Sequence, residues 1–103
     1  ERRDFSKMKN QSLVISCGSG CAMTYNVKEI KEINSASIKV TFEVDMHEDE
    51  KLTENYPETY IFNYGNTNTI TRVNDTGKND NIADTFTPNA LKSFREFARK
   101  LIQ

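Results

Sequence analysis

The clearest pattern in the chain is a strict alternation of apolar and polar side chains over ten residues, from position 38 to position 47. Every second residue is apolar, and the set is Ile38, Val40, Phe42, Val44 and Met46. The residues between them are polar or charged. This period of two predicts a β-strand with one buried face and one solvent-exposed face.

Shorter patterns on both sides of that segment predict further strands. Residues 13–16, 22–27 and 59–64 each show the short apolar run or the alternation that is typical of a strand. Residues 27–33 fit either a helical turn or a strand that continues through a bulge, because their apolar positions suit both spacings.

Polar segments between the strands predict the turns and loops. Small and polar residues dominate residues 34–37 and 74–84, which predicts a turn and a loop. The charged stretch that ends near Pro57 is also predicted to be a loop. Gly65-Asn66 has the glycine-first sequence of a two-residue type II′ hairpin turn. That turn would pair Tyr64 with Thr67, Phe62 with Thr69, Ile61 with Ile70, and Tyr60 with Thr71.

The C-terminal segment, about residues 88–102, is predicted to be an amphipathic helix. Thr87 is a suitable N-cap, and Pro88 suits the first helical position. Apolar residues recur on one helical face, at Ala90, Leu91, Phe94, Phe97, Ala98, Leu101 and Ile102. Strands followed by one helix predict an α+β fold, in which an antiparallel sheet of about four to six hairpin-connected strands carries the helix on one face.

Length and composition limit the size of the core. A chain of 103 residues suits a single small domain over 1–103, and residues 1–10 are polar enough that we expect them to fray. The hydrophobic fraction is 36%, with six Phe, four Tyr and no Trp, so aromatic side chains must supply much of a thin core. No apolar run approaches the roughly 20 residues that a transmembrane helix needs.

Charge is distributed unevenly although it nearly cancels. The chain has 14 basic and 15 acidic residues and a net charge of −1, which argues against a nucleic-acid-binding protein. Residues 43–58 contain seven acids and one base, a net −6, whereas residues 1–42 carry +3 and residues 59–103 carry +2. The acids are Glu43, Asp45, Glu48, Asp49, Glu50, Glu54 and Glu58. A segment of this sign can steer a cationic partner, although many charged runs are only solvated loops.

The two cysteines, Cys17 and Cys21, are separated by Gly-Ser-Gly. This flexible spacer can bring their Cα atoms to the roughly 5.5 Å that a disulfide needs, so we predict a structural disulfide. Free buried thiols, or a metal or redox site, are the alternatives. A disulfide would place the protein outside the cytosol, in the periplasm, the cell envelope or the secreted fraction. The start at Glu1 rather than Met is expected of a processed chain.

We find no catalytic constellation in the sequence. His47 is the only histidine and lies between Asp45 and Asp49, on the strand face predicted to be solvated. A calcium loop starting at Asp45 is excluded, because Glu50 stands where an EF-hand needs glycine and Tyr56 where it needs glutamate. We therefore expect no catalytic residue, no metal site and no cofactor. A hydrolase that uses His47 with a neighbouring aspartate is a third hypothesis.

We expect a non-enzymatic binding module, a small inhibitor or immunity-type protein that captures a cationic toxin or hydrolase through the acidic segment. Tyr60, Phe62 and Tyr64 either form an exposed aromatic strip beside this segment or pack in the core. The predicted partner-binding residues are Glu43, Asp45, His47, Glu48, Asp49, Glu50, Glu54, Tyr60, Phe62 and Tyr64. The alternative is a structural or accessory soluble domain of a bacterial cell-envelope lipoprotein. The oligomeric state stays open.

Overall fold

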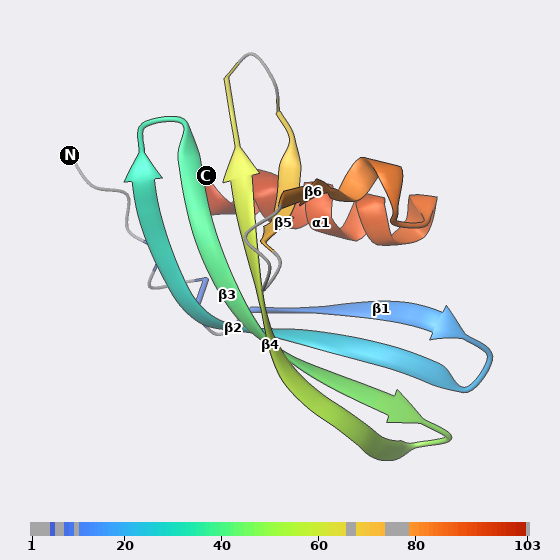
Figure 1. Cartoon of the computed structure of the whole chain (residues 1–103). Coiled ribbons are helices and arrows are strands. Elements are labelled where there is room, and N and C mark those ends of the chain that lie inside the picture. Colours follow the sequence, from blue (N-terminus) through green and yellow to red (C-terminus); the bar gives the residue numbers. More distant parts are fainter. Residues whose placement is uncertain (1–4, 6–7, 10, 66–67, 74–78, 103) are drawn as a thin grey trace.

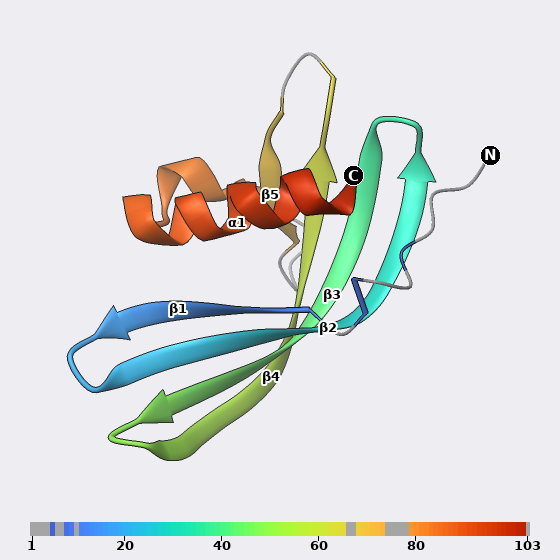
Figure 2. The same cartoon turned by 180° about the vertical axis from the view of Figure 1, so that it is seen from behind.

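A bent antiparallel sheet of six strands holds one helix on its concave side (Figure 1), and the view from behind shows the helix crossing the angle of the bend (Figure 2). The computed structural model describes residues 5, 8–9, 11–65, 68–73 and 79–102, with Cys17 described as backbone only. The sheet is a meander in which each strand pairs with the next one along the chain. The predicted α+β fold is therefore confirmed.

The elements follow one another without a crossover. The strands are β1 (Ser12–Gly18), β2 (Cys21–Asn34), β3 (Ser37–Glu48), β4 (Lys51–Asn63), β5 (Ile70–Val73) and β6 (Asn79–Asn81). A short 3-10 helix, η1 (Ile82–Asp84), precedes the helix α1 (Pro88–Leu101).

The alternation in β3 produces the centre of the core. Its residues Ile38, Val40, Phe42 and Val44 are completely buried. Helix α1 buries Ala90, Phe94, Phe97 and Leu101 against this face. The ring centroid of Phe42 lies 6.0 Å from that of Phe94 and 5.4 Å from that of Phe97. The predicted contact between the helix and the β3 face is thus present, and aromatic rings form most of it.

The start of α1 follows from local sequence. The Thr87 hydroxyl accepts a hydrogen bond from the backbone N–H of Ala90 at 3.3 Å, and Pro88 occupies the first turn, where its missing N–H costs nothing. Ile102 was predicted to lie on the buried stripe, but the helix ends at Leu101 and the Ile102 side chain is 44% exposed.

Strand β2 resolves the ambiguity of residues 27–33. They are strand rather than helical turn, and the pairing with β3 shifts register between Val27 and Glu29, as a β-bulge does. The pairing of β3 with β4 also shifts register, between Met46 and His47. Bulges bend a strand and increase its twist, and the long strands β2, β3 and β4 are all strongly curved (Figure 1).

The charged stretch before Pro57 is not a loop, so that prediction was wrong. Strand β4 begins at Lys51 and pairs with β3 over its full length. The connection is a two-residue turn in which Asp49 and Glu50 have φ values of 50° and 69°. Two-residue hairpin turns of type I′ need positive φ at both positions and usually contain Asn-Gly or Asp-Gly. Asp-Glu is an unusual sequence for such a turn, which explains why composition favoured a loop.

The predicted register of the β4–β5 hairpin was wrong by one residue. Phe62 pairs with Ile70, Ile61 with Thr71, and Tyr60 with Arg72. The backbone N–H of Asn63 donates to the carbonyl of Thr69 at 2.8 Å, so the connection is longer than the two residues predicted. Asn66 and Thr67 themselves lie outside the described residues. The shift brings Ile70 onto the buried face beside Phe62, where burial of both side chains favours it.

Residues 79–84 were predicted to be loop but form β6 and η1. The Asn81 side chain accepts from the N–H of Ala83 at 2.9 Å and caps η1, which buries Ile82 to 1% exposure. Most of the segment predicted to fray lies outside the described residues, but Met8 is 93% buried in the core, since only 7% of it is exposed.

Candidate functional sites

The seven acids of the predicted binding segment lie on one β-hairpin, residues 43–58, which we call the acidic hairpin. Its turn lies beside the β1–β2 turn (Figure 1), and the N–H of Asp49 donates to the carbonyl of Gly20 at 2.7 Å. Gly20 has φ of 73°, and a Cβ there would lie 2.7 Å from the Asp49 Oδ1 atom. The positive φ favours glycine at this position, and a larger residue would also displace the Asp49 carboxylate.

Two of the acids stand on the outer face of the sheet, and amide side chains hold them in place. The Asn55 Nδ2 group donates to Glu43 Oε1 at 3.0 Å and also to Asp45 Oδ1. The Asn26 Nδ2 group donates to Asp45 Oδ2 at 3.3 Å. These hydrogen bonds orient the two carboxylate groups on the outer face of the sheet.

Three further acids, Glu48, Asp49 and Glu50, are exposed at the turn and form what we call the acidic tip. A hollow of about 820 Å³ lies at this end of the sheet, and its lining includes Asp49, Glu50, His47, Ala22 and Val14. The hollow therefore combines carboxylates with apolar surface.

Exposed apolar side chains flank the tip, and the sequence patterns did not single them out. Val14 is 65% exposed and Leu52 is 58% exposed. Val14 pairs with Thr24 and Leu52 with His47, so alternation places both on the outer face, opposite the buried Tyr25 and Val44. A signal was available in retrospect only for Leu52, an isolated apolar residue between Lys51 and Thr53, because Val14 lies between the apolar residues Leu13 and Ile15.

The exposed aromatic strip does not exist, so that part of the predicted site is corrected. Tyr60 and Phe62 are completely buried, because their register partners Val40 and Ile38 belong to the core face of β3. Tyr64 is half-buried, and its hydroxyl donates to the backbone carbonyl of Ala98 in α1 at 2.6 Å. These three residues attach the sheet to the helix.

The remaining acids point away from the outer face. Glu54 is exposed, and its register partner is Met46. Glu58 lies at the edge of a cavity of about 260 Å³ beneath the start of α1, which is lined by Met23, Tyr25, Tyr56, Phe86 and others. The Tyr60 hydroxyl donates to Glu58 Oε1 at 2.7 Å, and Arg72 lies 3.9 Å from Glu58 Oε2. The acidic segment is therefore divided, and Glu58 belongs to an internal polar cluster.

The tyrosines of that cluster hold their protons strongly. Burial raises the pKa of Tyr25 and of Tyr60 far above the usual value near 10, and the negative charge of Glu58 adds to the effect. Burial also raises the pKa of Tyr56. All three hydroxyl groups are therefore hydrogen-bond donors over the physiological pH range.

His47 is half-buried in the outer row between Ala22 and Leu52. Within the described part of the chain, no three His, Cys, Asp or Glu side chains come together in a way that could hold a metal ion. The structure thus places His47 in the lining of the tip hollow, next to the acids with which the sequence grouped it.

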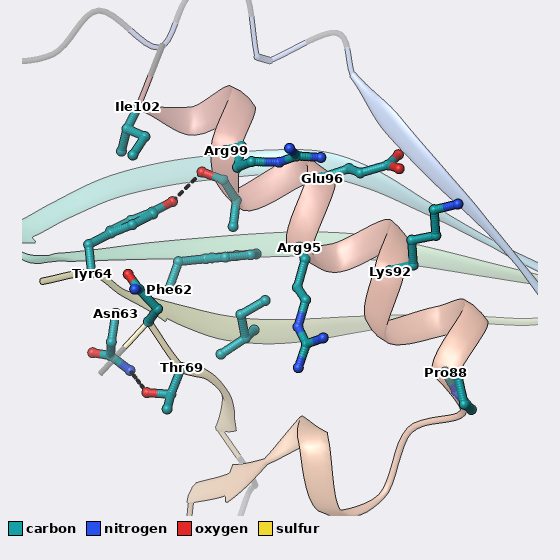
Figure 3. A pocket seen from close by; sticks show the side chains of 13 residues that line it. Phe62, Asn63, Tyr64, Thr69, Pro88, Lys92, Arg95, Glu96, Arg99 and Ile102 are labelled. Atoms are coloured by element: carbon teal, nitrogen blue, oxygen red, sulfur yellow. Dashed lines mark hydrogen bonds between the residues drawn. The ribbon is translucent and has the colours of Figure 1, made fainter. Parts of the chain in front are cut away.

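A groove of about 690 Å³ runs along the side of α1 that faces the end of β4 and the start of β5, and the sequence did not indicate it. It lies between the helix and the ends of β4 and β5 (Figure 3), with Phe62, Ile70 and Ala98 among its lining. Arg95 extends from the helix into this space, and Lys92 and Arg99 come from the same helix.

Cys21 is half-buried at the β1–β2 turn, and it is not a free thiol. The side chain of Cys17 lies outside the described residues, so the Cys17–Cys21 disulfide stays a prediction. The backbones of Gly18 and Cys21 are paired across the turn.

Among the described residues, no helix is both long enough and apolar enough to cross a membrane. Comparison with known proteins assigns no family, since no family model, curated protein or solved structure matches the chain.

Proposed function

We propose that this protein is a non-enzymatic binding module, of the inhibitor or immunity type, that captures a cationic protein through the acidic tip. The observation that carries the proposal is the hollow at the tip, whose lining includes both the acids Asp49 and Glu50 and the apolar residue Val14. A lysine or arginine side chain has the matching chemistry, because its aliphatic stem packs on apolar surface while its charged head seeks carboxylates.

The position of the charges supports steering of such a partner. Glu48, Asp49 and Glu50 are exposed at one end of a molecule 44 Å long, and Glu43 and Asp45 extend the negative surface along the outer face. Exposed charges of one sign raise the association rate of an oppositely charged protein, and salt weakens this effect.

The rigidity of the tip also favours binding. The hydrogen bond between Asp49 and Gly20 joins the two turns, and the Asn55 and Asn26 amides orient the acids behind them. A surface that is already arranged loses little conformational entropy when it binds. Val14 and Leu52 supply exposed apolar surface beside the charges, as in an interface whose apolar centre has a polar rim.

Binding outside the cytosol remains part of the proposal through the predicted disulfide. Mass measurement of the alkylated protein before and after reduction tests it directly. Two additional alkylated cysteines after reduction are expected, whereas alkylation of both cysteines without reductant would contradict it.

The test of function compares two charge-matched variants as immobilised baits in an extract of the source organism. Glu48→Gln, Asp49→Asn and Glu50→Gln together neutralise the tip. Glu29→Gln, Asp84→Asn and Glu96→Gln remove the same charge from exposed positions elsewhere. A basic protein should be retained by the unaltered chain and by the control at low salt, released at high salt, and lost from the tip variant.

The identified protein is then titrated against all three chains by calorimetry. A fall in affinity of at least tenfold for the tip variant alone is expected. Equal retention by all three baits, or retention of no basic protein by any of them, would contradict the proposal and favour the accessory domain of the cell envelope.

A further inference from the structure

The groove on α1 is open although its floor belongs to the hydrophobic core. Phe62 is completely buried and Ile70 is 7% exposed, so these two residues underlie the groove but offer almost no accessible surface. The half-buried side chains of Ala98 and Tyr64 supply accessible apolar surface instead. Ile102, 44% exposed, adds an apolar wall at the C-terminal end of the helix. A volume of about 690 Å³ is in the range of small-molecule binding sites.

Cationic side chains dominate the helical wall of this groove. Lys92, Arg95 and Arg99 recur at intervals of three and four residues, which places them on one side of α1. Among the described residues, Arg72 forms ion pairs with Glu58 and Asp80, whereas no carboxylate pairs with these three cations. Glu96 is the one acid in the lining, so the wall has a net positive charge.

Arg95 occupies the central position among them. Its side chain extends from the helix toward the side of Thr69, whereas the side chains of Arg99 and Lys92 point away from that space (Figure 3). A guanidinium group presents paired N–H donors in the geometry of a carboxylate or phosphate. The polar side chains of Asn63, Asn68 and Thr69 line the same end of the groove.

From these observations we infer that the groove is a binding site for an amphipathic organic anion, whose acidic head pairs with Arg95 and whose apolar body lies along Ala98 and Tyr64 toward Ile102. This inference does not depend on the acidic tip, because the groove shares no lining residue with the tip hollow. The two proposals can therefore fail separately.

The ligand class is tested with three probes and the unaltered chain, by calorimetry at neutral pH and below the micelle concentration. Decanoate carries both an apolar tail and a carboxylate, decanol carries the tail alone, and acetate carries the carboxylate alone. Decanoate should bind at least tenfold more tightly than either of the others, since it alone combines a carboxylate for Arg95 with an apolar tail for the groove. Decanol binding as tightly as decanoate would overturn the inference.

The position of the head group is tested with Arg95→Gln and Arg95→Lys. The glutamine variant should lose roughly tenfold or more in decanoate affinity, and the lysine variant should fall between it and the unaltered chain because it keeps the charge without the planar fork. Lys39→Gln, an exposed change on β3, is the matched control and should leave affinity unchanged.

Arg95 is exposed, so folding of its variants is expected to be intact and is checked by thermal unfolding. Unchanged decanoate affinity in Arg95→Gln would overturn the inference, as would an equal loss in the Lys39→Gln control. Absence of any decanoate binding to the unaltered chain would overturn it as well.

Discussion

The same two strands, β3 and β4, build two regions of opposite character. At one end, Phe42, Tyr60 and Phe62 are completely buried beneath α1. At the other end, residues 48–55 are all exposed, and the pairing of the strands continues to the turn. The buried end is held by packing, and the exposed end mainly by the hydrogen-bonded ladder and a few side-chain amides. Stability is therefore concentrated under the helix, which leaves the acidic tip free to present charges to solvent.

The largest expected effect comes from the centre of the buried end. The Phe94 ring lies within 6.5 Å, centroid to centroid, of five other aromatic rings: Tyr25, Phe42, Tyr60, Phe62 and Phe86. Phe94→Ala should lower the free energy of unfolding by about 3–5 kcal/mol, because it removes these contacts and leaves a cavity. Urea denaturation measures the loss.

Leu52→Ala is the matched truncation at the exposed end, where the side chain is 58% exposed. This variant should lower the free energy of unfolding by about 0.5 kcal/mol or less. Similar losses of unfolding free energy for Phe94→Ala and Leu52→Ala would mean that stability is spread evenly over the sheet rather than concentrated under α1.

A smaller effect is expected at alkaline pH, and it also belongs to the buried end. The pKa of Tyr25 and of Tyr60 is raised in the folded state, chiefly by burial, so the unfolded chain loses these protons first. Their contribution to stability is complete below pH of about 10 and declines above it. At a pH of about 11, each of the two tyrosines should have lowered the free energy of unfolding by about 1.4 kcal/mol.

Urea denaturation at a pH below about 10 and at a pH of about 11 measures this decline, and the double variant Tyr25→Phe and Tyr60→Phe is the control. The double variant loses the Tyr60–Glu58 hydrogen bond and starts from lower stability. Its further decline on the alkaline side should nevertheless be smaller than that of the unaltered chain. An equal decline in both would show that the two phenols do not carry the effect.

A further small effect, of opposite sign, is expected in the turn of the acidic hairpin. Glu50 has φ of 69°, a conformation that glycine adopts without the steric cost borne by other residues. Glu50→Gly should therefore raise the free energy of unfolding by up to about 1 kcal/mol. Glu50→Ala removes the same charge but keeps a Cβ in the strained conformation, so it should raise the free energy of unfolding by less. If alanine stabilises as much as glycine, charge repulsion rather than backbone strain dominates at the tip.

Elements with strong local periodicity were predictable from the sequence. The alternation from Ile38 to Met46 and the helical stripe from Ala90 to Leu101 each specify an element and its buried face, because side-chain direction repeats with the period of the backbone. The capping of α1 by Thr87 followed from the same local chemistry. The acidic segment was visible as a charge pattern, although not as a hairpin, since Asp49 and Glu50 are unusual in a tight turn.

The tertiary structure decided what local patterns leave open. The β4–β5 register differs by one residue from that implied by Gly65, and a shift of one residue exchanges the two faces of a strand. Burial of Ile70 beside Phe62 selects the observed register, and that choice forms the floor of the groove on α1. The division of the acids between the outer face, the tip and the cluster around Glu58 has the same origin. Sequence determined which segments could form strands and a helix, whereas packing between distant segments determined which side chains reach solvent.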